Sequence, residues 1–354
     1  MSLEARLRSH PKYELASRAF KEWKLRKRNA TTVFSVSNGG NVGNQEYILS
    51  LVVVVAVAIN CDAAVEFDST ANGVFETVIQ KKGVQNPHKL SFEDLMCRNL
   101  TQLSKERNLQ VDWANTFFSP YWLYSNIYHK TFMEDTFGDV PFGLMSQFLF
   151  VASEKLANDV ASFEATKLNS CNFVVGIHIR YGRGPSDIYF SLSNSLDIGR
   201  KVGRFAQSLI ENRTTNQGCI FLATDNHPIR QHFPEFVANT TRIVSQDFIA
   251  GPDASTPYNS VFDQELLARS DVMIGTFMSS FSFYPMARGL FSESYWINPF
   301  GDIFRSPPDG GIPWMKNNSH TDGFLANIII KNQEASNTCG HDMSPMRKWL
   351  ITKY

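Results

Sequence analysis

One stretch of the chain combines a strand pattern with residues suited to binding phosphate. The segment Phe173 to Gly184 reads FVVGIHIRYGRG. Its β-branched and aromatic residues predict a buried strand, and the glycines at its end predict a loop. His178 and Arg180 are two residues apart, so they project from one face of an extended chain. A guanidinium beside backbone N–H groups exposed by glycine suits a diphosphate. The alternative is that Arg180 only forms an ion pair with a carboxylate at the strand end.

Two later strand ends carry complementary groups. The strand GCIFLATD ends in Asp225, which can accept hydrogen bonds from ribose hydroxyls or from the N1–H and amine of guanine. Ser279 and Ser280 follow another strand, at the expected start of a helix where N–H groups favour an anion. Ligands of open α/β sheets bind at the carboxyl ends of the strands. Together with Arg180, these groups predict a nucleotide diphosphate site.

The motifs resemble those of the superfamily of GDP-fucose-dependent α1,2-, α1,6- and protein O-fucosyltransferases. The matching pieces are GGNVGNQ near the start, HIR after the buried strand, ATD at the next strand end and a late SSF, in the same order over about residues 36–300. The segment DQELLARSDVMIGT that precedes SSF looks most like the plant xyloglucan-type α1,2-fucosyltransferases.

This resemblance implies a GT-B fold, which is an α/β fold of two Rossmann-like domains that face a cleft. It implies an inverting transfer of fucose from GDP-fucose to a hydroxyl of a glycan or glycoprotein, with no divalent metal and no cofactor besides the donor. Arg180 would be the catalytic residue, bound to the β-phosphate. The implied donor-binding residues are Asn44, His178, Arg180, Asp225, Ser279, Ser280 and Phe281. One departure is that many relatives have an acid soon after the arginine, whereas this chain has Arg183 and reaches an acid only at Asp187.

The elements that position these groups follow from hydrophobic periodicity. A strand over 32–37, a helix over 46–60 and a strand over 64–68 predict a parallel βαβ unit. Strands ending near 179, 225, 245 and 276, with helices between them, predict a second, doubly wound sheet. We therefore expect a charged, helix-prone arm over 1–30 that is either a surface or a partly disordered segment, an N-terminal acceptor-side domain over 31–165, a nucleotide-sugar domain over 166–300, and a C-terminal coil and tail over 301–354.

Composition indicates a globular protein and limits its partners. The 354 residues are 43% hydrophobic, and 34 basic residues balance 34 acidic ones, so no bulk attraction to nucleic acid is indicated. The longest apolar run, Leu49 to Ile59, is about half the ~20 residues that cross a bilayer, so we expect no membrane span. Five scattered cysteines allow at most two disulfides and one free thiol.

The compartment is predicted from conflicting signals. Five N-x-S/T sequons and the resemblance favour the Golgi lumen and a role in cell-wall or other glycan biosynthesis. However, residues 1–30 contain no signal or anchor segment, so a Golgi location would require an anchor outside this sequence.

Other functions and an unassigned catalytic base stay open at this point. A non-catalytic GT-B module that binds a nucleotide sugar or glycan is a second class, and a histidine phosphatase is a third that lacks the expected RHG order. An acceptor hydroxyl also needs a base, for which Glu46, Asp62 and Asp68 are candidates that the sequence does not rank.

Overall fold

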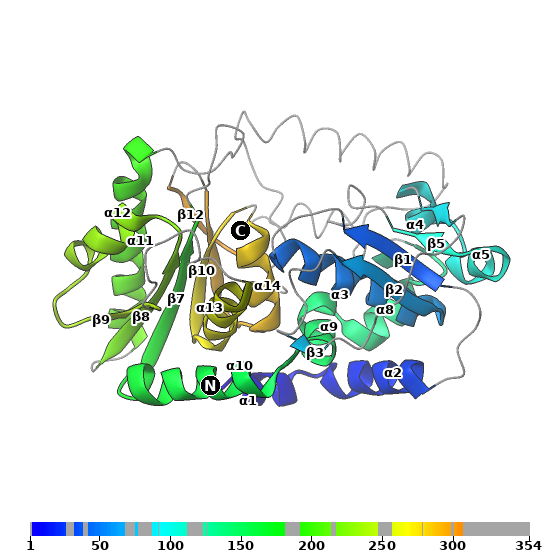
Figure 1. Ribbon diagram of the computed structural model, residues 1–354, viewed down its shortest axis with the longest axis horizontal. Helices are drawn as coiled ribbons and strands as arrows, with labels where there is room; N and C mark the ends of the chain where they lie inside the picture. The colour runs from blue at the N-terminus through cyan, green and yellow to red at the C-terminus, as the bar shows by residue number, and fades with distance from the viewer. Residues whose placement is uncertain are drawn as a thin grey trace.

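The computed structural model describes most of the first 306 residues. The described ranges are 2–25, 32–37, 42–67, 75–76, 87–90, 92–111, 123–124, 126–180, 192–213, 217–246, 257–277, 279–298 and 301–306. Within them the chain forms a mixed α/β structure with two main sheets, which lie one after the other along the long axis of the molecule (Figure 1). This confirms the predicted α/β class with parallel sheets.

The first sheet has the order β2-β1-β5-β4. Its strands are β1 (Thr32–Ser37), β2 (Asp62–Phe67), β4 (His88–Lys89) and β5 (Leu109–Gln110), and each neighbouring pair is parallel. The predicted βαβ unit is therefore confirmed, although its helix α3 (Val42–Ile59) begins four residues earlier than expected. The α4 (Phe92–Cys97) and α5 (Leu100–Glu106) helices join β4 to β5.

Helix α3 is stable although its composition favours strands. Val52, Val53, Val54 and Val55 are all fully buried. A helix that is apolar on all sides is stable when it is surrounded, and α3 packs between β1, β2, α9 (Pro141–Leu149) and α14 (Ser280–Arg288). Burial of the valines outweighs their weak helix propensity.

Residues 2–25, which belong to the segment predicted to be a helix-prone surface or partly disordered arm, are largely helical. They form α1 (Leu3–Ser9) and α2 (Tyr13–Leu25), which run along one side of the molecule (Figure 1). Phe20 of α2 is buried and stacks on Phe148 of α9 with ring centroids 5.4 Å apart. The apolar side of α2 is narrow, but aromatic side chains fill it, and that is enough to hold the helix in place.

The connection between the sheets is made of several short elements and not of one continuous helix. It consists of α8 (Lys130–Phe137), α9, β6 (Val151–Ala152), α10 (Glu154–Phe163) and a π-helical turn over Glu164–Leu168, and β6 pairs with β3 (Phe75–Glu76). Ser153 causes the break, because its side chain accepts a hydrogen bond from the Leu156 N–H and begins α10 as an N-cap.

The second sheet has the order β12-β11-β10-β7-β8-β9. Its strands are β7 (Phe173–Ile179), β8 (Gly218–Thr224), β9 (Arg242–Val244), β10 (Val272–Thr276), β11 (Ser294–Ile297) and β12 (Ile303–Arg305). All neighbours are parallel except β12, which runs antiparallel to β11. The connecting helices are α11 (Leu192–Arg213), α12 (His227–His232) with a 3₁₀ turn over Phe233–Phe236, α13 (Pro257–Arg269) and α14. β11 was not predicted, and β12 lies in the segment predicted to be coil.

One hydrophobic core connects the helices of both halves. Phe142 of α9 meets Phe283 of α14 edge to face at 5.3 Å, and Phe150 meets Tyr284 at 5.3 Å. The buried Arg288 of α14 donates a hydrogen bond to the carbonyl of Ser146 in α9. Helix α14 packs against α3 and α9 of the first half and against α13 and β10 of the second, and its position determines where its N-terminus lies.

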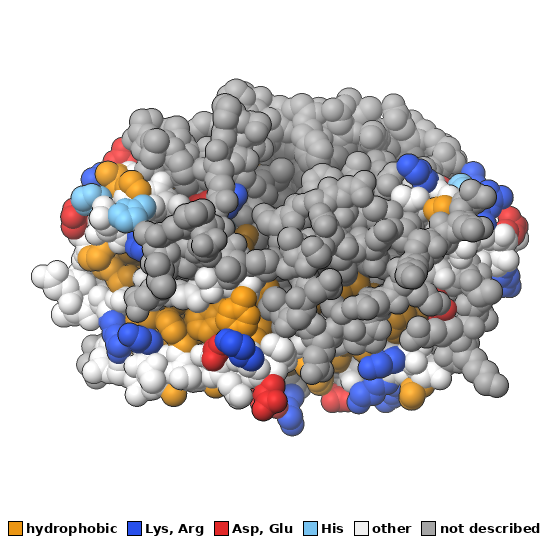
Figure 2. Space-filling view, viewed as in Figure 1, with side chains coloured by type: hydrophobic (Ala, Val, Ile, Leu, Met, Phe, Trp, Pro, Cys, Tyr) orange, Lys and Arg blue, Asp and Glu red, His pale blue; other side chains and the backbone are white. Residues whose placement is uncertain are grey.

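The surface and the cysteines agree with the expectations from composition. On the face shown in Figure 2, acidic and basic side chains of the described residues are interspersed. Cys171 and Cys219 form a disulfide between the starts of β7 and β8, Cys97 is also disulfide-bonded, and Cys61 is a buried free thiol. None of the helices in the described ranges has both the length and the apolar character of a membrane-spanning segment.

Candidate functional site

The chain order reverses within the second sheet between β7 and β10. The chain runs outward from β7 to β8 and β9, and then returns to add β10 on the other side of β7. A parallel sheet opens a crevice at such a switch point, outside the carboxyl ends of the two central strands. Arg180 follows β7 directly, and Ser279 lies three residues beyond the end of β10. The topology therefore brings the HIR and SSF motifs to one edge.

Arg180 forms an ion pair with Asp225 at this edge. Its Nη1 lies 2.8 Å from Oδ2 of Asp225, and the two side chains are 26% and 20% exposed. The structure thus joins two predicted site residues and also realises the ion pair that was the alternative reading of Arg180. Because both side chains keep part of their surface in solvent, the pair lies at the rim of the sheet and not in its core.

Two threonines fix the backbone that carries Arg180. The hydroxyl of Thr276, at the end of β10, donates to the His178 carbonyl at 2.9 Å and accepts the Arg180 N–H at 2.8 Å. On the other side of β7, the Thr224 hydroxyl donates to the Ile179 carbonyl at 2.7 Å. Both threonines are buried, so these bonds are shielded from water. They add side-chain hydrogen bonds to the end of β7 from both neighbouring strands, and the sequence analysis did not single them out.

His178 stabilises this edge through a ring contact and a hydrogen bond. Its ring is buried and stacks on Phe281 with centroids 4.4 Å apart, and its Nδ1 shares a hydrogen bond of 2.5 Å with the Ser282 hydroxyl. Burial, together with the nearby Arg180 charge, lowers the His178 pKa to about 3. The imidazole is therefore neutral at physiological pH, and its geometry fits a support for Phe281 better than a charged phosphate ligand.

Helix α14 begins at this edge. Ser279 is its N-cap residue and is buried, Ser280 is its first residue, and the Ser279 side chain makes no capping hydrogen bond. The first turn of a helix presents N–H groups and a positive dipole end to an anion. Gly275 allows the close approach of α14 to β10, because a Cβ there would lie 2.9 Å from Cβ of Ser282. Arg180 and the α14 N-terminus are thus two sources of positive potential on one edge.

A buried acid near β8 was missed by the sequence analysis. Asp263 of α13 is 4% exposed, and its Oδ1 has no hydrogen-bond partner in the part of the chain that the structure describes. Burial raises its pKa to about 8, opposed by the charge of Arg230, whose Nη2 donates to the Thr224 carbonyl at 2.8 Å. The sequence signal was the polar run DQE between the apolar pairs Val261–Phe262 and Leu266–Leu267.

The remaining predicted residues stand as follows. Asn44 lies in the first turn of α3, the helix that packs against α14, but its side chain is outside those described. Arg183, Asp187 and Asp68 lie outside the described residues, as does the side chain of Glu46. Asp62 is buried at the amino-terminal start of β2, the opposite end from the edge where a parallel sheet binds ligands. Its position therefore argues against a role as the base.

Comparisons with known proteins give structural matches only. No family model matches the chain, and no curated protein matches its sequence. Among solved structures, an Arg-to-Lys mutant of Arabidopsis thaliana FUT1 in complex with GDP has a TM-score of 0.62 at 11% identity, over 89% of this chain and 85% of that one. NodZ α-1,6-fucosyltransferase co-crystallized with GDP has a TM-score of 0.52 at 12% identity, over 80% and 99%. NodZ from Bradyrhizobium has a TM-score of 0.51 at 14% identity, over 80% and 100%.

The chain shares the fold of these fucosyltransferases. The likeness drawn from the four short motifs is therefore confirmed at the level of the fold, at 11–14% sequence identity. The fucosyltransferase fold covers most of this chain and nearly all of NodZ, so the match is to a whole protein and not to one Rossmann-like unit. In the described residues, no group of three or more His, Cys, Asp or Glu side chains is arranged to hold a metal ion.

Proposed function

We propose that the protein is a glycosyltransferase that moves fucose from GDP-fucose to a hydroxyl of a glycan or glycoprotein. The observation that carries this proposal is the placement of Arg180 and the N-terminus of α14 at the same edge of the sheet, at the switch point between β7 and β10. The fold is shared with proteins crystallised with GDP, which supports a guanine nucleotide as the ligand.

The roles of the residues follow from the charge that develops during transfer. The bond between the sugar C1 and the β-phosphate oxygen breaks, and GDP leaves with the electron pair. The acceptor oxygen forms the new bond to C1 from the opposite face, inverting the configuration, and its proton passes to a base that we do not assign. Arg180 and the first-turn N–H groups of α14 stabilise the charge on the phosphate. In this proposal they do so without a divalent metal.

The other predicted residues hold the nucleotide. Asp225 keeps the Arg180 fork oriented and offers its remaining lone pairs to ribose or guanine. Phe281, fixed by the His178 ring beneath it, provides an apolar surface for the donor. In the full GT-B arrangement that we propose, Asn44 lines the same cleft from the first domain.

A lumenal, oxidising compartment of the Golgi type fits the cysteine chemistry. Cys171–Cys219 and the bonded Cys97 support it, because disulfides persist in oxidising compartments. Asn239 of the sequon NTT is exposed in a turn, where an added glycan would meet no packed neighbour. We further propose that the acceptor is a cell-wall or similar glycan, on the basis of the xyloglucan-type motif resemblance.

Calorimetry with GDP-fucose, GDP-mannose and UDP-sugars tests donor binding, and GDP release from GDP-fucose tests turnover. We expect binding of guanine nucleotides only, with turnover of GDP-fucose fastest. The Arg180–Asp225 ion pair also fits a non-catalytic module, since the pair leaves less net charge to assist a leaving phosphate. Measurable GDP binding with no turnover of any sugar nucleotide would support that module and contradict the enzyme.

A further inference from the structure

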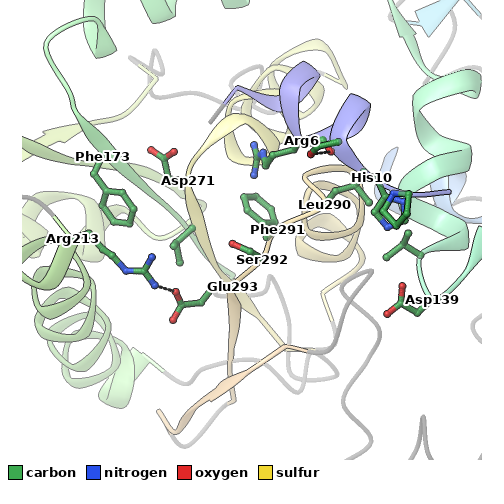
Figure 3. Close-up of a pocket in the computed structure, with 14 residues that line it drawn as sticks. Arg6, His10, Asp139, Phe173, Arg213, Asp271, Leu290, Phe291, Ser292 and Glu293 are labelled. Carbon is green, nitrogen blue, oxygen red and sulfur yellow. Dashed lines mark hydrogen bonds and ion pairs between the residues drawn. The ribbon is translucent and has the colours of Figure 1, made fainter. Parts of the chain in front are cut away.

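A cavity lies at the opposite edge of the second sheet from the proposed donor site. Its volume is about 490 Å³, and it is lined by α1, the starts of β7 and β10, and the turn after α14 (Figure 3). Phe173 lines the cavity and begins β7, whereas Arg180 follows the end of this seven-residue strand. At about 3.3 Å per residue, the two sites are roughly 20 Å apart. The cavity is therefore separate from the nucleotide edge.

Arg6 is the feature of this cavity that needs an explanation. Its Nη2 donates to the Ala268 carbonyl at 2.8 Å, and its Cζ lies 4.7 Å from the centroid of the Phe291 ring. Its Nε and Nη1 are buried and have no hydrogen-bond partner among the described residues. Burial lowers its pKa to about 10, so Arg6 stays charged at neutral pH. A desolvated guanidinium with unused donors is costly unless an acceptor meets it.

Among the described residues, the carboxylates around the cavity do not form ion pairs with Arg6. Both oxygens of Glu293 are engaged, one by Arg213 and the other by the Tyr295 hydroxyl. Asp271 accepts the Val174 N–H at 2.9 Å and interacts with Arg6 only through its charge. Asp139 is exposed at the far end of the cavity, beside His10 (Figure 3). None of the three forms an ion pair with Arg6 in the described part of the chain.

The walls and the net charge define the class of ligand. Phe173, Val272, Leu290 and Phe291 provide apolar surface, which suits a hydrocarbon body. Three acids near one available guanidinium favour a singly charged anion over a dianion such as phosphate. We propose that this cavity binds a small organic carboxylate with an apolar body, and that Arg6 receives its carboxylate group. The site lies where the N-terminal helices meet the second sheet, so occupancy would strengthen that contact.

Benzoate is the probe for this site, with neutral benzamide of the same shape as its comparison. We expect saturable benzoate binding in ligand-observed NMR with a dissociation constant of roughly 1 mM, the scale for so small a ligand. Arg6→Gln keeps a donor for the Ala268 carbonyl but removes the charge, and it should weaken binding at least tenfold. Arg8→Gln is the matched control, because Arg8 is on the same helix but is exposed and paired with Glu4. It should bind as the unmodified protein does.

The proposal is overturned by any of several results. These are no detectable benzoate binding, equal binding of benzamide, unchanged binding in Arg6→Gln, or tighter binding of inorganic phosphate than of benzoate. Competition by GDP would also overturn it, since benzoate would then occupy the donor edge. Arg6→Lys guards against loss of fold, because it keeps the charge and should retain most of the binding. GDP titration of the same samples reports on the donor site separately.

Discussion

Replacement of Arg180 separates a catalytic cation from a structural ion pair. The Arg180–Asp225 contact is 2.8 Å long between side chains that are 26% and 20% exposed. At an effective dielectric constant near 20, the gross attraction between charges at this separation is about 6 kcal/mol, and desolvation and solvent screening reduce the net value to about 1–2 kcal/mol. In the transition state of the proposed reaction, the same guanidinium would meet a growing phosphate charge, for which loss of one preorganised donor costs roughly 10²- to 10³-fold in rate.

We therefore expect Arg180→Ala to lose about 100-fold or more in kcat for GDP release from GDP-fucose. Its free energy of unfolding in urea should fall by no more than about 2 kcal/mol. The kcat of Arg180→Lys should lie between that of the unmodified protein and that of Arg180→Ala, because Lys keeps the charge but not the planar fork. Arg200→Ala removes an exposed arginine that pairs with Asp197 on α11, and it should change neither quantity by a comparable amount.

The outcome that refutes the reasoning is specific. If Arg180→Ala keeps more than a tenth of its kcat, Arg180 does not assist the leaving phosphate. If the variant instead unfolds, Arg180 is a structural residue whose pairing with Asp225 supports the end of the sheet. Asp225→Asn provides the complementary test, since it should weaken GDP binding in calorimetry while leaving the fold intact. Unchanged GDP affinity in this variant would remove Asp225 from the site.

Three further predictions test the surroundings of the site. Thr276→Val removes both hydrogen bonds from this side chain to the backbone around Arg180, and it should lower kcat roughly tenfold with a smaller change in KM. Thr166→Val is the control, because it removes only local hydrogen bonds at an exposed turn and should leave kcat unchanged. Because the pKa of His178 is lowered to about 3 in the folded protein, only the unfolded chain binds a proton at this residue as the pH falls below about 6.5. The free energy of unfolding in urea should therefore be about 2 kcal/mol lower at pH 5 because of this group. In His178→Asn this part of the dependence of the unfolding free energy on pH should be absent. Replacement of Cys171 and Cys219 by Ser opens a loop of 48 residues and should lower the free energy of unfolding by about 4 kcal/mol, because the unfolded chain gains entropy. Urea unfolding of this variant and of the oxidised protein measures the difference, and a loss below about 1 kcal/mol would contradict the prediction.

Local patterns in the sequence were sufficient to predict the main strands and the motif order. The β-branched runs that end at Ile179, Thr224 and Thr276 have strand length and are bounded by polar or glycine residues, so their position depends on neighbours in the sequence. The order of the HIR, ATD and SSF motifs indicated the fucosyltransferase fold that the structural matches later confirmed. The rule that parallel strands bind ligands at their carboxyl ends then predicted a common edge for Arg180 and Asp225.

The contacts within that edge were decided only by the tertiary structure. Thr276 bonds to the backbone of Arg180 across 96 positions of sequence, and His178 meets Ser282 across 104, so both depend on the insertion of β10 beside β7. Likewise, the narrow apolar side of α2 predicted an arm, and only the position of Phe148 made Phe20 a buried residue. Periodicity records which face of an element is apolar, but the partner of that face comes from the strand order and the packing of distant helices, which no local pattern encodes.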